Sequence, residues 1–146
     1  MIDKIKTRLG SDEGFTLIEL LVVIVILGIL VAIAVPAYLS FRGSANDAAA
    51  KSNVRSAVPA AEGYYQANTT NPNSYTGMDL PALQAQSPGV DGHLTVAVSA
   101  DGKSYCLQDD NNGAGQSYFY VGGADAATVT PGGGEVAQGT CPATLA

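Results

Sequence analysis

The feature that most constrains this chain is an almost uninterrupted apolar run from Phe15 to Leu39. A helix of about 20 apolar residues crosses the hydrocarbon core of a bilayer, so this run is long enough for one crossing. Its one charged residue is Glu19. A carboxylate in such a helix is costly unless it finds a partner, which makes Glu19 a functional candidate. Because Arg42 lies about six helical turns away, the partner must be a new amine or another molecule.

The segment Gly14-Phe15-Thr16-Leu17-Ile18-Glu19 follows a short charged leader and opens the apolar helix. It resembles the class III signal of type IV prepilins and their pseudopilin relatives. The resemblance implies cleavage between Gly14 and Phe15 by a membrane prepilin peptidase, followed by N-methylation of Phe15. It also implies that Glu19 neutralises the Phe15 ammonium of a neighbouring subunit as the filament assembles. The missing partner of Glu19 is then intermolecular.

Three other interpretations of the apolar run remain open. A buried core helix is disfavoured because the rest of the chain is too small to surround a helix that is apolar on all sides. An ordinary secretory signal would use the basic leader and a cleavage site at Ala32-Ile33-Ala34. The third interpretation is a permanent membrane anchor that does not polymerise. None of these accounts for Gly14-Phe15 and Glu19 together.

The distribution of charge indicates the orientation of the chain in a membrane and argues against nucleic acid as a partner. Three basic residues precede the apolar run, which places the N-terminus in the cytoplasm and the C-terminus outside. Apolar residues form 47% of the sequence and charged ones only 14%, so the surface is expected to be neutral and polar. Beyond Gly63 only Lys103 opposes seven acidic residues, which argues against direct binding of nucleic acid.

The expected organisation has three parts. Residues 1–14 form a leader peptide, residues 15–41 a transmembrane and filament-core helix, and residues 42–146 a globular pilin head. The head is divided into an amphipathic helix at 42–67, a connecting loop at 68–89 with a short helix around 80–86, and a sheet with a disulfide-tethered tail at 90–146.

Two positions are expected to weaken the first part of the helix. Gly28 has a low helix propensity, and Pro36 removes one backbone hydrogen bond. We therefore expect a kink or a local melt between them. The resemblance to type IV pilins implies the same, because their filaments behave like springs partly through unwinding of the corresponding segment. Pro59 is expected to kink the amphipathic helix, whose apolar stripe comprises Ala50, Val54, Ala57, Val58, Ala61 and Tyr65.

Alternating apolar residues and turn signals predict a small antiparallel sheet of three or four strands. The strands are expected at 94–98, 104–107, 117–121 and, with a weaker pattern, 127–130. Turns are expected at Asp101-Gly102 and Asn112-Gly113. Together with the long helix, the sheet predicts an α+β pilin fold.

Two cysteines, Cys106 and Cys141, lie in the part expected to be exported. An oxidising compartment permits a disulfide, which would stabilise a small domain by roughly 3 to 4 kcal/mol. A metal or redox pair would instead favour C-x-x-C spacing or nearby histidines, and the sequence has neither. We expect the two to pair, as in the C-terminal disulfide loop of the pilins that the chain resembles.

Other polar motifs give weak signals for chemistry. Asp109, Asp110 and Asn111 could contribute oxygen ligands to calcium, but the full spacing of a calcium loop is absent and a polar turn is the simpler interpretation. His93, the single histidine, is interpreted as a strand-edge residue. The aromatic segment 118–120 is expected to pack in the sheet rather than to stack on nucleotides. No nucleophile, acid and base set is recognisable, so neither an enzyme nor a cofactor is expected.

The resemblance implies a structural subunit that polymerises into a type IV pilus for adhesion, motility or DNA uptake. Expected partners are further copies of the chain, the membrane, the prepilin peptidase, and an assembly ATPase with its platform protein. The subunit would cross the membrane once before assembly and lie in a cell-surface pilus afterwards. The alternatives are a pseudopilin of a type II secretion or competence system and an exported binding or enzyme domain behind an ordinary signal.

Overall fold

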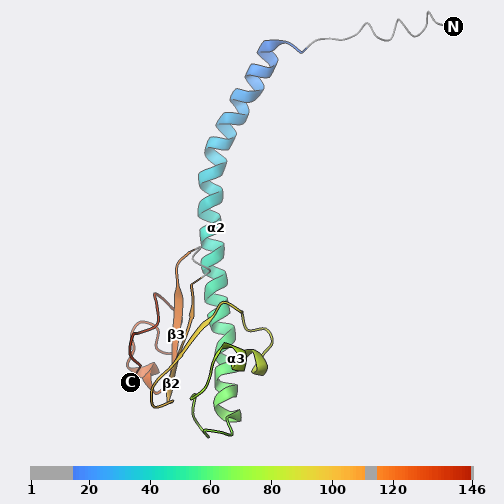
Figure 1. Cartoon of the computed structure of the whole chain (residues 1–146). Coiled ribbons are helices and arrows are strands. Elements are labelled where there is room, and N and C mark those ends of the chain that lie inside the picture. The colour runs from blue at the N-terminus through green and yellow to red at the C-terminus, as the bar shows by residue number, and fades with distance from the viewer. Residues whose placement is uncertain (1–14, 111–114, 146) are drawn as a thin grey trace, which may run out of the picture. The chain divides into compact units, whose positions relative to one another are not determined.

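A computed structural model of the chain describes residues 15–110 and 115–145. The structure has two units, Met1–Ser40 and Phe41–Ala146, and the second is called the head below. Helix α2 (Leu17–Ala67) contributes to both (Figure 1). The other elements, all in the head, are α3 (Leu80–Gln86), β1 (Thr95–Val98), β2 (Ser104–Asp109), β3 (Tyr118–Gly123), the 3-10 helix η2 (Ala124–Ala127) and β4 (Ala137–Gln138).

Helix α2 is continuous, although it contains Gly28, Pro36 and Pro59. Of the kink or local melt expected between Gly28 and Pro36, a melt does not occur, and the helix also continues through Pro59. A proline removes one backbone hydrogen bond, whereas the bonds of the neighbouring turns remain. Near Pro59 the helix is also held by packing, because Ala57 before it and Ala61 after it are both fully buried.

The head buries one stripe of α2 against the sheet. Ala50, Val54, Ala57 and Ala61 are fully buried, as the helical spacing predicts, and Val58 and Tyr65 pack beside them. Alanines at these positions let the helix backbone approach the sheet closely. The short helix α3 adds Leu83 to the same core, at the residues where the sequence predicts a helix.

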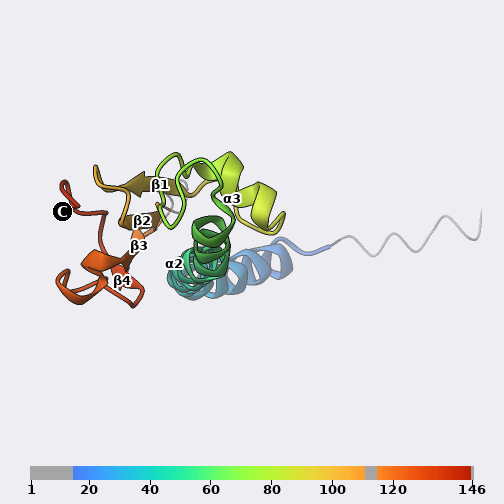
Figure 2. The same cartoon turned by 90° about the horizontal axis from the view of Figure 1, so that it is seen from below.

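The sheet is antiparallel with the order β1-β2-β3-β4, and its two faces pack on different partners. Side chains alternate between the faces of a strand. Tyr105 and Leu107 of β2 therefore join the core with α2, whereas Cys106 joins a second cluster with Phe119 and Val121 of β3. Figure 2 shows α2 on one side of the sheet and the C-terminal segment on the other. The α+β fold expected from the sequence is confirmed.

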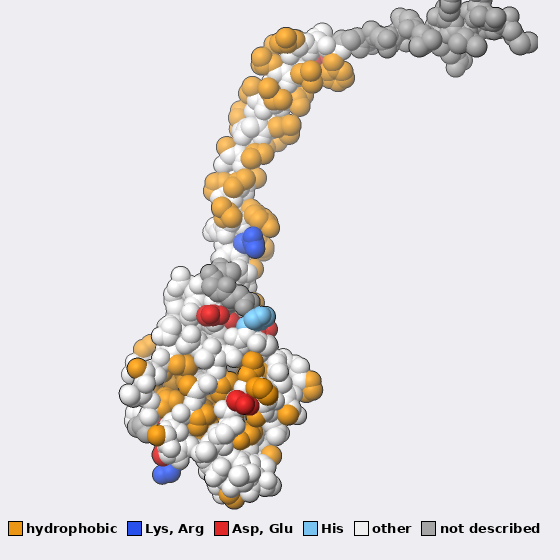
Figure 3. Space-filling view, viewed as in Figure 1, with side chains coloured by type: hydrophobic (Ala, Val, Ile, Leu, Met, Phe, Trp, Pro, Cys, Tyr) orange, Lys and Arg blue, Asp and Glu red, His pale blue; other side chains and the backbone are white. Residues whose placement is uncertain are grey.

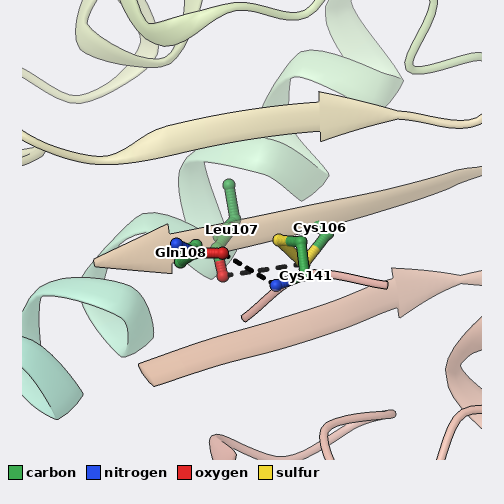
Figure 4. The surroundings of a disulfide bond; sticks show 4 residues. All are labelled: Cys106, Leu107, Gln108 and Cys141. Atoms are coloured by element: carbon green, nitrogen blue, oxygen red, sulfur yellow. Dashed lines mark hydrogen bonds between the residues drawn. A yellow bond between two sulfur atoms is a disulfide. The ribbon is translucent and has the colours of Figure 1, made fainter. Parts of the chain in front are cut away.

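A disulfide between Cys106 and Cys141 ties the C-terminal segment to this second face, as predicted. The two Cα atoms are 5.9 Å apart. The backbone N–H of Cys141 also donates a hydrogen bond of 2.7 Å to Oε1 of Gln108 (Figure 4). Val129, Ala137 and Leu145 pack in the same cluster, so the tether closes a small second core.

The fourth strand is not where the sequence pattern placed it. The segment predicted as a strand at 127–130 begins within η2, whose last residue is Ala127, and the N–H groups of Thr128 and Val129 both donate to the carbonyl of Asp125. These local bonds use backbone groups that a sheet ladder would need. The strand that pairs with β3 is instead β4, through Tyr118 with Gln138 and Phe119 with Ala137.

Four tyrosines form a row inside the head, with Glu62 at its centre. The ring centroids of Tyr65 and Tyr75 are 4.8 Å apart, those of Tyr75 and Tyr105 are 4.6 Å apart, and those of Tyr105 and Tyr120 are 6.1 Å apart. The hydroxyls of Tyr105 and Tyr75 donate hydrogen bonds of 2.9 and 3.1 Å to the Glu62 carboxylate. Burial, reinforced by this carboxylate, raises the pKa of both tyrosines above its usual range.

This tyrosine row predicts loss of stability in alkali. Below pH ~10 a tyrosine is protonated in both the folded and the unfolded chain, so the stabilisation is complete there. Above that pH the unfolded chain releases protons that the folded head retains, so stability falls with rising pH by about 1.4 kcal/mol per pH unit for each tyrosine. Urea unfolding of the full chain in non-ionic detergent between pH 9 and 11 should show this fall. Tyr75→Phe should reduce the slope of the unfolding free energy against pH by about half, since Tyr105 still contributes. An unchanged slope would show that Tyr75 does not cause the fall.

The disulfide gives a second stability prediction. Its cysteines are 35 residues apart, and closing a loop of that length restricts the unfolded chain. Replacing both cysteines by alanine should lower the free energy of unfolding by about 4 kcal/mol. Urea unfolding measures the change, and reduced wild-type protein provides the matched control because it opens the same loop without a substitution. Equal stability of the oxidised and reduced chains would refute the prediction.

Candidate functional site

The segment singled out by the sequence lies at the N-terminal end of α2. Phe15 is the first described residue and its side chain is 73% exposed. Thr16 directly precedes the helix, and Glu19 is its third residue. Gly14, the other half of the expected cleavage site, lies outside the described residues. An acidic side chain in the first turn interacts favourably with the positive end of the helix dipole.

Thr16 and Glu19 interact as a helix cap. The backbone N–H of Glu19 donates to Oγ1 of Thr16 at 3.4 Å, and that hydroxyl donates to Oε2 of Glu19 at 3.3 Å. Both bonds are long, so each is weak. Thr16 did not stand out in the sequence analysis, although T-x-x-E before an apolar run is the pattern of a capping box. The cap places the Glu19 carboxylate beside the Thr16 hydroxyl at the helix terminus.

Glu19 has no cationic partner within the described residues, whose ion pairs are those of His93 with Asp91 and Lys103 with Asp101. Cleavage before Phe15 would create an ammonium at the positive end of the helix dipole, where a cation is unfavourable unless an anion lies nearby. Glu19 is the only carboxylate on the apolar segment. The site can therefore pair one carboxylate with one terminal amine.

The surface around Glu19 is apolar on every side. From Phe15 to Phe41 the large apolar side chains are all exposed, and even the least exposed of them, Leu21, is 45% accessible. Figure 3 shows hydrophobic side chains along this segment. In the described part of the chain, α2 is long and apolar enough to cross a membrane. Such a surface requires either lipid or the apolar helices of other molecules.

The candidate calcium ligands are not brought together in the described residues. Asp109 is buried, and its Oδ2 accepts a hydrogen bond of 2.8 Å from Nδ2 of Asn53. Asp110 is exposed, and Asn111 lies outside the described residues, as does the turn predicted at Asn112-Gly113. Across the described ranges no three acidic, histidine or cysteine side chains gather in a group that could hold a metal.

The single histidine and the aromatic segment 118–120 make contacts that stabilise the fold. His93 precedes β1 instead of lying on it, and its Nδ1 is 3.2 Å from Oδ1 of Asp91. The aromatic segment packs in the sheet, as expected. Tyr118 faces the core with α2, whereas Phe119 faces the disulfide cluster. The ammonium of Lys51 lies 4.7 Å from the centre of the Tyr118 ring, a cation–π distance.

Comparison with known proteins places this site in a family. Residues 10–35 match the family model of the prokaryotic N-terminal methylation motif, which includes Gly14, Phe15 and Glu19. The type II secretion system core protein G of Pseudomonas aeruginosa is 39% identical over 69 residues, which are 47% of this chain and 49% of that protein. No solved structure matches the chain.

Two relatives from Thermus thermophilus extend the similarity into the head. The type IV wide pilus major component PilA4 is 36% identical over 104 residues, which cover 70% of this chain and 76% of the relative. The type IV narrow pilus major component PilA5 is 34% identical over 111 residues, covering 65% of this chain and 93% of the relative. The methylation motif, the α+β fold and this coverage show that the chain belongs to the type IV pilin family.

Proposed function

We propose that the chain is the precursor of a structural subunit that polymerises into a type IV pilus after cleavage between Gly14 and Phe15. The observation that carries the proposal is the uncovered apolar segment of α2 with a single carboxylate, Glu19, at its N-terminal end. Before assembly this segment lies in the membrane as a single crossing with its N-terminus in the cytoplasm. In the filament, which lies at the cell surface, the same segments pack against one another and exclude water.

Glu19 guides assembly in this proposal. Cleavage supplies an ammonium at Phe15, which is then N-methylated and keeps its charge. The Glu19 carboxylate of one subunit pairs with the Phe15 ammonium of its neighbour, so two costly charges leave the lipid as one pair. Thr16 holds the carboxylate at the helix terminus until the neighbour arrives. Gly28 and Pro36 are the positions where α2 loses helical stability most easily if it unwinds on assembly.

The proposed partners follow from this cycle. They are further copies of the chain, the membrane, a prepilin peptidase, and an assembly ATPase with its platform protein. The role is structural and involves no catalytic step. A pseudopilin that builds a periplasmic filament is the second candidate, favoured by the similarity to the type II secretion core protein G. The wide and narrow pilus relatives are matched over larger shares of their length, which favours the pilus.

The processing step predicts the N-terminus of the mature protein. Mass spectrometry of the protein from cells should find a chain that begins with N-methylated Phe15. A mature chain that begins near Val35 would mean that the apolar run is a discarded signal, and it would overturn the proposal. If processing is as proposed, electron microscopy of fibres sheared from the cell surface decides between a pilus and a pseudopilin.

Glu19 variants test the assembly step. Glu19→Ala should leave cleavage at Phe15 intact but abolish or strongly shorten the filaments, because the Phe15 ammonium loses its counter-ion. Glu19→Asp is the matched control, since it retains the charge and should retain part of the filament yield. Sheared filaments are measured by electron microscopy and protein gel, and processing by mass spectrometry. Normal filaments from Glu19→Ala would rule out this role for Glu19.

A further inference from the structure

A groove on the head is not used by the assembly site. It has a volume of about 410 Å³ and lies between α2 and the segment that precedes β4. Val58 and Pro59 of α2, Tyr120 of β3 and Val136 form its apolar walls. Val58, Tyr120 and Val136 are half-buried, so the walls are fixed by the core behind them.

Two opposite charges line this groove without meeting. Arg55 and Glu135 are both exposed, and within the described residues neither takes part in an ion pair. Lys51, one helical turn before Arg55, is engaged with the Tyr118 ring. An occupant that brings one acidic and one basic group would therefore complement the groove, whereas an occupant of a single charge would be attracted by one side and repelled by the other.

The β1–β2 turn of the same chain carries such a pair of charges. Oδ1 of Asp101 accepts hydrogen bonds from Oγ of Ser99 at 2.6 Å and from the N–H of Lys103 at 2.9 Å, which fixes the turn. The Lys103 side chain is 70% exposed, and its ammonium is 3.8 Å from Oδ2 of Asp101. Lys103 is also the only lysine or arginine after Arg55 in the sequence. The turn thus presents an acid and a base two residues apart on a rigid loop.

We propose that the groove receives the β1–β2 turn of a second copy of this chain, with Lys103 pairing with Glu135 and Asp101 facing Arg55. The groove and the turn share no residue, so the contact joins two different surfaces of the head. A contact of this heterologous kind repeats from copy to copy and builds an open array when it does not close into a ring. The inference rests on the proposed filament and specifies a contact between heads within it.

Charge exchange between Glu135 and Lys103 tests the contact in the full chain. Glu135→Lys and Lys103→Glu each bring like charges together, so each should lower the yield of sheared filaments by about tenfold. The double variant restores an opposite pair and should recover most of the wild-type yield. Thr69→Lys also adds positive charge but lies at an exposed position outside the groove, and it should assemble normally. Wild-type yields from both single variants, or a double variant as poor as they are, would overturn the contact.

Cross-linking of wild-type filaments gives a readout that does not depend on the folding of a variant. A zero-length carbodiimide should join the Lys103 amine to the Glu135 carboxyl, giving a dimer band and a linked peptide in mass spectrometry. Subunits dispersed in detergent should lack this peptide. Its absence from filaments in which other cross-links form would refute the contact while leaving the proposed function intact. Failure of wild-type protein to form filaments would overturn both.

Discussion

The apolar surface of α2, which none of the described residues covers, is the constraint on which this molecule depends. Water is an unfavourable environment for a segment that is apolar on every side, so lipid or the apolar helices of other molecules must cover it. The sequence changes after Phe41, where apolar residues narrow to one stripe of mostly small side chains. That change lets the same helix serve as the scaffold on which the head folds.

The head is small, and its stability comes from covering both faces of one short sheet. The stripe of α2 covers one face, and the segment tethered by Cys141 covers the other. Gly122 stands opposite Tyr105 in the sheet, and a side chain there would collide with the Tyr105 ring. The absence of a side chain at Gly122 therefore gives Tyr105 the room to reach Glu62, which accepts a hydrogen bond from the hydroxyl of this buried tyrosine.

The sequence predicted those features that depend on local pattern or on a single strong chemical preference. The apolar run, the stripe on α2, the first three strands and the cysteine pair are of this kind. It did not predict β4, because two residues paired with Tyr118 and Phe119 carry no periodicity of their own. The role of Glu62 also escaped notice, since Tyr75 and Tyr105 reach it from distant positions in the chain. Helix α2 continues on both sides of Pro59, as the apolar stripe that runs past it indicated.

Apolar burial explains why subunits of this kind would associate, but it does not explain why they would associate in one register. Hydrophobic contact is non-directional, and helices that are apolar all round can slide past one another with little change in buried area. Polar contacts remove that freedom because each demands a specific partner. In the proposed filament Glu19 would fix the register of the helices. The head has only four lysines and arginines, which are too few for a general electrostatic attraction between subunits: Arg42, Lys51, Arg55 and Lys103. An ion pair that one of them forms with a neighbouring subunit would therefore help to set the relative position of the two subunits.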